Sequence, residues 1–476
     1  MSLIIAGERS GVGKTTVTLA LLAYLRRHQA RVQSFKVGPD YIDPMFHRAV
    51  TDRPCRTLDP VLTSARYVQQ CFATYAQTAD YAVIEGVMGL FDGAGPEIQA
   101  GKRLAEPELA IAGAYGSTAH IARLLHQPVL LVVDCSRMSQ SIAALVQGYR
   151  SWVPQIQLAG VVLNRVGSDR HLELLQAALE PLKVPILGVL RRHDDITIPD
   201  RHLGLVPTAE LPQLQPLIEQ LADLAADWFE WEPLLPLLQV KPPLSPCLAA
   251  PLPAPMASPL RVAIAVDAAF SFYYPDNLDR LSALGAELVE WSPLQDAALP
   301  PTVNGLYFGG GFPEMFAAQL GANTPMRQAV YAAVQAGMPT YAECGGLMYL
   351  CQHIVDFQGQ AEAMVGVLPA IAHMGQRLTL GYRQVRALQG GILCKPGAIA
   401  WGHEFHRSHL TASTPQPLFE QQLPNPKTKT TEGFWAANLH ASYVHLHWGD
   451  RPDLPQRFLS HCHAFANRNE RSSEHK

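Results

Sequence analysis

The first 25 residues constrain the fold of this chain more than any other stretch. An apolar run at residues 3–6 leads into the glycine-rich segment 7–16, and a helical apolar pattern then continues to Leu25. This order predicts a strand, a tight loop and a helix. Gly11 and Gly13 let the loop turn so that its backbone N–H groups converge on an anion, and the helix N-terminus favours negative charge at the same place. The segment therefore predicts a phosphate-binding loop.

The side chains of this loop suit a nucleotide with a divalent cation. Lys14 would reach the β- and γ-phosphates, and the Thr15 hydroxyl would complete a Mg²⁺ shell. The first position of the pattern G-x-x-x-x-G-K-[ST] is Glu8, and the glycine stands one residue earlier. We predict that the nucleotide is bound by Gly11, Val12, Gly13, Lys14, Thr15 and Thr16.

Charged and polar side chains also follow other predicted strands. Strand 31–36 ends in Lys36 and runs into Asp40, Tyr41, Ile42 and Asp43, in a loop bounded by prolines. Strand 81–85 ends in a carboxylate, as Walker B strands do, so Glu85 would hold Mg²⁺ directly or through water. Asn164 follows strand 158–163 and offers an amide to an adenine edge. Because open α/β sheets bind ligands at the carboxyl ends of their strands, we expect these residues around one site.

Length and composition bound the number of domains and the class of partner. A chain of 476 residues with 48% apolar residues is expected to form two or three globular domains. The net charge of −4 favours neither a nucleic-acid nor an anionic-membrane partner. The eight cysteines form no C-x-x-C pair, which is typical of a reducing compartment, and the first strand leaves no room for a signal peptide. We expect a cytoplasmic protein.

Changes in composition divide the chain. Residues 1–233 alternate strand and helix patterns, which predicts an α/β domain with a mostly parallel sheet. Residues 234–259 are rich in proline, lack a period and are predicted to be a linker. A second α/β domain is expected at 260–465, followed by a polar tail at 466–476 that we expect to be disordered.

Cys344 stands where a short predicted strand meets a helix, with a small residue two positions before it and a glycine two positions after. This spacing is typical of a nucleophile elbow, which places the sulfur at a helix N-terminus that favours the thiolate. A lone cysteine is often only a small buried apolar residue. A nucleophile needs a base, and the run from His440 to His447 offers three histidines, including His445. The segment 403–406, H-E-F-H, is one residue too short for H-E-x-x-H and is expected to be a structural or substrate-lining loop.

Taken together, these stretches resemble the cobyrinic acid a,c-diamide synthases, glutamine-dependent amide ligases of vitamin B12 biosynthesis. The matching stretches cover nearly the whole chain and are residues 10–16, 36–44, 85–93, 265–278, 309–314, 342–347, 402–406 and 441–448. The resemblance implies a P-loop domain similar to dethiobiotin synthetase and MinD-like ATPases. It further implies a second domain similar to class I glutamine amidotransferases.

The resemblance also implies a reaction. A carboxylate is a poor electrophile, so ATP would first phosphorylate an acetate side chain of cobyrinic acid, with Lys14, Lys36 and Mg²⁺ absorbing negative charge. Cys344 would attack the amide of L-glutamine, with His445 as base and then acid. The ammonia released would amidate the acyl phosphate, at the c and then the a acetate.

The family pattern assigns further roles by position. Backbone N–H groups of Gly310, Gly311 and Gly345 are candidates for the oxyanion hole. The corrin would be placed by Asp40, Tyr41, Ile42, Asp43 and Asp92, and the metal by Thr15, Asp40 and Glu85. The wider amidotransferase class has a glutamate two residues after the base, where this chain has His447. The cobalamin enzymes work with a Cys–His dyad, so we expect no orienting carboxylate.

Several alternatives stay open at this point. The same chemistry would suit hydrogenobyrinic acid or nickel-sirohydrochlorin, because both carry comparable acetates. Cobyric acid synthase amidates other side chains, and the stretch 40–43 speaks against it. A rival of another class is a non-catalytic MinD-like ATP switch that dimerises on nucleotide, so a homodimer is also among our expectations.

Overall fold

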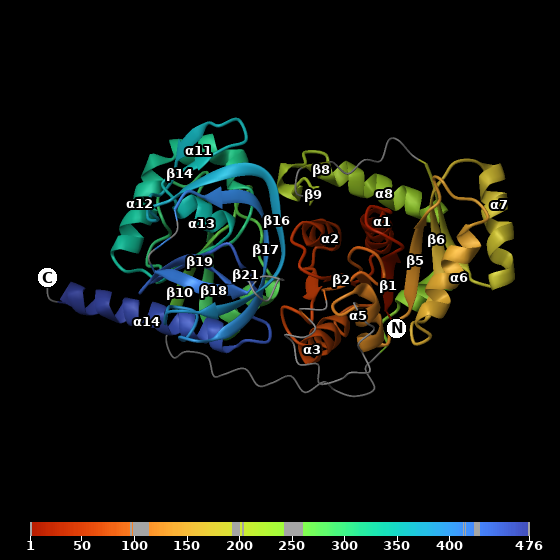
Figure 1. Cartoon of the computed structure of the whole chain (residues 1–476), viewed down its shortest axis with the longest axis horizontal. Helices are drawn as coiled ribbons and strands as arrows, with labels where there is room; N and C mark the ends of the chain where they lie inside the picture. The colour runs from red at the N-terminus through yellow and green to blue at the C-terminus, as the bar shows by residue number, and fades with distance from the viewer. Residues whose placement is uncertain are drawn as a thin grey trace. The chain divides into compact units, whose positions relative to one another are not determined.

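The computed structural model describes residues 2–95, 98, 114–192, 200–201, 204–241, 260–412, 414, 416–422 and 429–474. The chain divides into two compact units, Met1–Ala249 and Ala250–Lys476. Each unit has its own sheet and is described by itself (Figure 1). In the part of the chain that the structure describes, no helix is long and apolar enough to cross a membrane.

The first unit is built on a seven-stranded sheet in the order β3-β2-β4-β1-β5-β6-β7, and every pairing in it is parallel. Its strands are β1 (Leu3–Gly7), β2 (Val32–Val37), β3 (Arg56–Leu58), β4 (Tyr81–Glu85), β5 (Val129–Asp134), β6 (Leu158–Val166) and β7 (Ile186–Arg191), with a separate hairpin of β8 (Asp200–Arg201) and β9 (Gly204–Leu205). The predicted parallel α/β sheet is confirmed.

Helices cover both faces of this sheet. They are α1 (Lys14–Arg27), α2 (Asp43–Thr51), α3 (Ala65–Ala76), α5 (Thr118–Leu125), α6 (Ile142–Trp152), α7 (Asp169–Leu179), α8 (Leu214–Trp228) and α9 (Trp231–Leu238), with 3₁₀ turns η2 (Glu180–Leu182) and η3 (Thr208–Glu210). Helix α1 packs against α2 and α8 on one face, and α3 packs against α5 on the other (Figure 1). Because helices cover both faces, β1, β2 and β5 are buried at every residue. Strand β1 is apolar throughout, whereas β2 also buries Gln33, Ser34 and Lys36.

The boundaries of the first unit differ from the sequence prediction in two places. Strand β3 was not predicted, because three residues are too few for a pattern of alternation to be recognised. Helix α9 occupies the start of the segment predicted to be a linker, and Pro236 lies inside it. Tyr81 forms a β-bridge with Gln239, which ties the end of this helix to the start of β4. Most of the remaining predicted linker, residues 242–259, lies outside the described residues.

The second unit contains a larger mixed sheet. Strands β11-β10-β12-β13-β20 are parallel, and β19, β18 and β16 continue the sheet in antiparallel pairings. Its strands are β10 (Leu260–Ala265), β11 (Ala286–Trp291), β12 (Gly305–Phe308), β13 (Thr340–Glu343), β14 (His353–Val355), β15 (Ala361–Ala363), β16 (Ile371–Ala387), β17 (Ile399–Leu410), β18 (Pro417–Gln422), β19 (Lys429–Ala436), β20 (Leu439–Ser442) and β21 (His445–Leu446).

The helices of the second unit include the short one that follows Cys344. They are α10 (Pro275–Ala283), α11 (Ala317–Ala322), α12 (Thr324–Gln335), α13 (Gly345–Leu350) and α14 (Asp453–Glu474), with the 3₁₀ turn η4 (Pro313–Phe316). Helix α14 continues to Glu474, so most of the tail that we expected to be disordered is helical. Apolar side chains near its start, such as Phe458 and Cys462, are buried and anchor it.

Candidate functional site

The phosphate loop of the first unit has the geometry that its glycines predict. Gly11 has φ +76° and Gly13 has φ +94°, both in the left-handed region that favours glycine, and α1 begins directly afterwards at Lys14. A Cβ atom on Gly13 would lie 2.3 Å from Nδ2 of Asn164, so only glycine fits there. The predicted cradle at a helix N-terminus is therefore present.

Lys14 is buried at the inner wall of this loop. Its Nζ donates to the carbonyl of Met88 at 2.6 Å and to that of Arg9 at 3.4 Å. Burial and the charge of nearby Lys36 lower the pKa of Lys14. A negative charge next to Lys14, such as that of a phosphate, would therefore stabilise its charged ammonium.

Asn164 lies against the phosphate loop, with both ends of its amide engaged. Its Nδ2 donates to the carbonyl of Val12 at 2.7 Å, and its Oδ1 accepts from the N–H of Arg165 at 2.8 Å. In this structure the amide of Asn164 contacts the backbone of the phosphate loop. A nucleotide contact at Asn164 remains a prediction.

Lys36 is the centre of a buried charge cluster at the ends of β2 and β4. Its Nζ lies 2.5 Å from Oδ2 of Asp43, 2.9 Å from Oε1 of Glu85 and 3.6 Å from Oδ2 of Asp40. Burial alone would lower the pKa of Lys36, but these carboxylates raise it well above its usual value. The ammonium is therefore charged, and it neutralises carboxylates that burial would otherwise penalise.

The pKa values of two carboxyl groups in this cluster, Asp43 and Glu85, shift in opposite directions. Burial and the charge of Asp40 raise the pKa of Asp43 to about 8, with Lys36 opposing the shift. Burial also acts to raise the pKa of Glu85, but Lys36 and His47 outweigh it and lower the pKa. Glu85 is therefore the permanent anion of the cluster.

The hydroxyl of Thr15 joins the same cluster. Its Oγ1 lies 2.7 Å from Oε1 of Glu85 and 3.3 Å from Oδ2 of Asp43. One hydroxyl and two carboxylates supply the hard oxygen donors that Mg²⁺ prefers, and in this structure the ammonium of Lys36 contacts the same two carboxylate oxygens. Asp40, which we had expected as a ligand, instead accepts the N–H groups of Ile42 and Asp43 through Oδ1. The carboxylate nearest to Thr15 besides Glu85 is that of Asp43, because the chain turns at Asp40 to begin α2. A role for Asp40 as a metal ligand remains a prediction.

His47 is a member of this cluster that the sequence prediction missed. Its Nε2 lies 2.6 Å from Oε2 of Glu85, and its Nδ1 lies 3.3 Å from Sγ of Cys55. Both His47 and Glu85 are fully buried. The available signal was the spacing of Asp43 and His47, since residues four apart share one face of a helix.

The other residues predicted to place the substrate lie just after β2 and β4 in the chain. Tyr41 and Ile42 are mostly buried, so only a small part of either side chain can meet a ligand. Asp92 accepts the N–H of Gly89 at 2.9 Å and so closes the loop after β4. The roles of these residues toward a corrin remain predictions.

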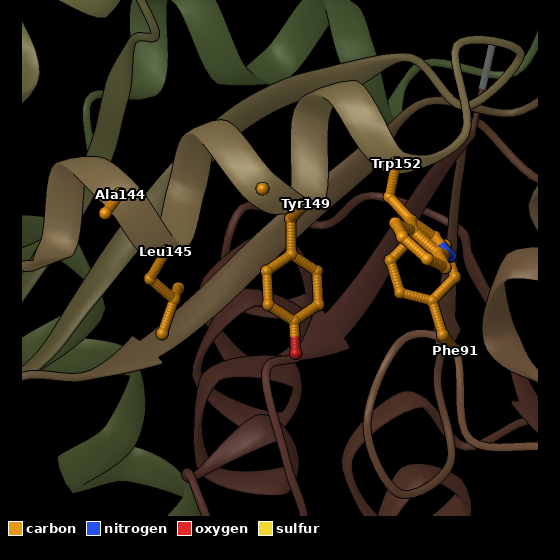
Figure 2. A pocket seen from close by; sticks show the side chains of 6 residues that line it. Phe91, Ala144, Leu145, Tyr149 and Trp152 are labelled. Atoms are coloured by element: carbon orange, nitrogen blue, oxygen red, sulfur yellow. The ribbon is translucent and has the colours of Figure 1, made fainter.

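An apolar pocket lies beside the phosphate loop. Phe91 and residues of α6 line a pocket of about 300 Å³. Figure 2 shows the side chains of Phe91, Tyr149 and Trp152 among those that line it. The Tyr149 hydroxyl donates to the carbonyl of Glu8 at 2.6 Å, which ties the pocket wall to the loop. The lining, Phe91, Ala144, Leu145, Gly148, Tyr149 and Trp152, carries no charged side chain, so this pocket is not suited to phosphate.

Cys344 of the second unit occupies the sharp turn that the sequence predicts. Its backbone has φ +48° and ψ −102°, a strained conformation for a residue with a side chain, and its N–H donates to Ser442 O at 2.7 Å. Burial and the charge of Glu314 raise the pKa of the Cys344 thiol, and the N–H of Gly345 only partly offsets this. The thiol donates to the carbonyl of Phe405 at 3.8 Å. The expectation of a favoured thiolate is therefore wrong for the resting site, and a base is required.

His445 and Cys344 both follow the carboxyl ends of neighbouring strands of the sheet. Strand β13, which ends just before Cys344, pairs in parallel with β20, which ends three residues before His445. A Cβ atom on Gly310 would lie 2.5 Å from Cε1 and 3.2 Å from Nε2 of His445, so the imidazole packs on the glycine loop after β12. A Cβ atom on Gly345 would lie 3.1 Å from the backbone nitrogen of Gly311 in that loop. The glycine loop after β12 therefore contacts both the base His445 and Gly345, the residue after the nucleophile.

The predicted oxyanion donors are only partly available. The N–H of Gly310 donates to the carbonyl of Phe272 at 3.3 Å, which removes it as a donor in this structure. Gly311 adopts φ +155°, and a Cβ atom there would lie 2.0 Å from Ala269 O, so only glycine fits. Gly311 and Gly345 thus remain the candidate donors, and Gly310 serves to admit the imidazole.

The segment 403–406 belongs to strand β17 and is not a loop as predicted. His403 pairs with His445 across β17 and β21, and burial and the charge of His445 lower the pKa of His403 to about 3. Glu404 forms a buried ion pair with Arg383 at 2.6 Å. Strand β17 therefore forms a wall of the site, and His403 is neutral there.

Glu343 is a second residue of the site that the sequence prediction did not identify. It directly precedes Cys344, and its Oε2 lies 3.6 Å from Nδ1 of His445, with both side chains buried. The available signal was a charged residue within a strand that is buried at every position.

Family models match both units. Residues 3–206 match the CobQ/CobB/MinD/ParA nucleotide-binding domain, and residues 261–453 match the CobB/CobQ-like glutamine amidotransferase domain. The predicted two-domain architecture is thereby confirmed.

Curated relatives align over nearly the full chain. A cobyrinate a,c-diamide synthase of Synechococcus is 57% identical over 97% of this chain and 98% of its own, and one of Synechocystis is 52% identical over 98% and 94%. A hydrogenobyrinate a,c-diamide synthase of Streptomyces coelicolor is 40% identical over 97% of each chain.

Proposed function

Because the chain belongs to the cobyrinate a,c-diamide synthase family, we propose that it amidates the a and c acetate carboxylates of cobyrinic acid, using ATP and glutamine. The observation that carries the proposal is the presence in one chain of a phosphate loop with a buried Lys36 cluster and of a glycine loop that contacts His445 and the residue after Cys344. The first suits activation of a carboxylate, and the second suits release of ammonia from an amide.

In the first unit, Lys14 and the loop N–H groups would hold the phosphates of ATP. Thr15, Asp43 and Glu85 would hold Mg²⁺, which when bound offsets the charge of the transferring phosphoryl group. Lys36 lies within reach of the same carboxylates and would stabilise the negative charge that develops during transfer. The acetate would leave this step as an acyl phosphate, which ammonia attacks with loss of phosphate.

In the second unit, His445 would take the proton of the Cys344 thiol as sulfur attacks the glutamine amide. The N–H groups of Gly311 and Gly345 would bind the oxyanion, and the imidazolium would return its proton to the departing ammonia. Water would then hydrolyse the thioester to glutamate. The raised pKa of the resting thiol supports a mechanism in which deprotonation accompanies attack.

A second candidate substrate is hydrogenobyrinic acid, because a hydrogenobyrinate a,c-diamide synthase is also a close relative. Mass spectrometry of both corrinoids after incubation with MgATP and glutamine tests the proposal. We expect two successive losses of about one mass unit, carboxylate to carboxamide, that require ATP. Failure of both corrinoids to change would refute the proposal, and a preference between them would identify the substrate.

A further inference from the structure

We propose that Glu343 is a positioning residue for the base His445, and that this carboxylate takes the place of the glutamate that other amidotransferases carry two residues after the base. The inference rests on the proposed glutamine hydrolysis. Glu343 directly precedes the nucleophile Cys344. Glu343 lies at the end of β13, and the base His445 lies on β21.

The carboxylate of Glu343 is fixed between the two strands. Its Oε1 accepts the N–H of Leu446 at 2.9 Å and also the hydroxyl of Tyr341. Burial raises the pKa of Tyr341 well above its usual value, so that hydroxyl keeps its proton and acts as the donor. An ionised carboxylate is only an acceptor, and Oε2 is then the oxygen that faces the imidazole.

The imidazole of His445 lies between Glu343 and the glycine loop. Its Nδ1 is 3.6 Å from Oε2 of Glu343, while its Nε2 and Cε1 face Gly310. A proton on Nδ1 directed at Glu343 leaves Nε2 as the acceptor on the side of the site. This is the tautomer that a base for Cys344 requires, and the carboxylate would stabilise the imidazolium that forms.

Two other side chains that could replace Glu343 as the partner of the base, His447 and Glu404, have partners of their own. His447, which occupies the position of the usual glutamate, has Nε2 3.9 Å from Oδ2 of Asp276 and accepts the N–H of Gly449 at Nδ1. Glu404 is paired with Arg383. Glu343 is thus a carboxylate that lies close to Nδ1 of the base.

The test compares Glu343→Gln with a matched control in the same unit. Glutamine retains an oxygen for Leu446 but places an amide or a neutral oxygen before Nδ1. The control is Glu432→Gln, which alters another buried carboxylate, one that accepts from Ser442 Oγ at 2.7 Å and from the Tyr443 N–H at 2.7 Å. Glutaminase kcat and KM, amidation driven by ammonium salts, and the rate of alkylation of Cys344 are measured for each full-length protein.

We expect Glu343→Gln to lower glutaminase kcat about 10²-fold with KM little changed, and to slow alkylation of Cys344. Amidation driven by ammonium salts should be retained, and Glu432→Gln should leave all of these quantities near wild type. Glu343→Asp keeps the charge, but its shorter side chain draws the carboxylate away from Nδ1, so glutaminase kcat should fall by more than about threefold and by less than in the glutamine variant.

A kcat for Glu343→Gln within about threefold of wild type would overturn the inference. So would a loss that appears equally in KM and in amidation from ammonium salts, because that pattern describes a damaged fold. If Glu343→Gln does not fold, Glu343→Asp decides, since an unchanged kcat there overturns the inference and a lower kcat at constant KM supports it. Wild-type protein without glutaminase activity would instead refute the proposed function.

Discussion

Gly310→Ala is expected to disable glutamine hydrolysis while sparing the rest of the enzyme. Gly310 is not among the residues with positive φ, so its backbone accepts alanine, and its N–H to Phe272 is retained. The new Cβ would lie 2.5 Å from Cε1 of His445, whereas carbon atoms in contact prefer about 3.5 Å. The imidazole must therefore retreat by about 1 Å.

A displacement of about 1 Å at a catalytic group costs about 10²-fold in rate, which corresponds to about 2.7 kcal/mol of transition-state stabilisation. The assay is glutaminase kcat for Gly310→Ala, with amidation from ammonium salts measured in parallel and expected to be unaffected. Gly375→Ala is the control, because its Cβ would make an ordinary contact at 3.4 Å with Arg407 O. A kcat for Gly310→Ala within about threefold of wild type would refute the reasoning, since the imidazole would not then be held by the glycine loop.

Three other outcomes follow from the buried groups. Lys36→Met removes the cation from buried carboxylates and should lower the free energy of unfolding by about 3–5 kcal/mol, measured by urea denaturation. Burial and the charge of Glu404 raise the pKa of Glu432 from 4.5 to about 8, so the folded state holds a proton that the unfolded chain has released. Stability should therefore fall as pH rises between these values, and Glu432→Gln should flatten that slope; identical slopes would contradict the assignment. Gly13→Ala places a Cβ 2.3 Å from Asn164 at φ +94° and should abolish ATP binding in a calorimetric titration, whereas retained affinity would contradict the cradle.

The parts predicted well from sequence are those in which local pattern and chemistry agree. The apolar strand before Gly7 and the glycines at 11 and 13 require a particular backbone, and the structure has it. The turn at Cys344 was recognised for the same reason, because small residues on both sides leave few alternatives.

The parts missed depend on contacts between segments far apart in the chain. The sequence does not distinguish Asp40 from Asp43 as the carboxylate that contacts Thr15. The turn into α2 brings Asp43 to Thr15 and directs Oδ1 of Asp40 to the backbone. Glu343 meets His445 because β13 and β20 are neighbours in the sheet, a pairing that a periodicity does not reveal. The thiol pKa was misjudged because a helix N-terminus is visible in sequence, whereas burial and Glu314 are not.

The central claim is that nitrogen released at Cys344 becomes the amide nitrogen of a corrinoid activated by ATP in the other unit. It is tested most directly by incubating the full chain with cobyrinic acid, MgATP and glutamine labelled with ¹⁵N at the amide. The account predicts a diamide carrying two labelled nitrogens, no product without ATP, and, for Cys344→Ala, product from ammonium salts only. A diamide formed by Cys344→Ala from glutamine, or formed by the wild type in the absence of ATP, would contradict it.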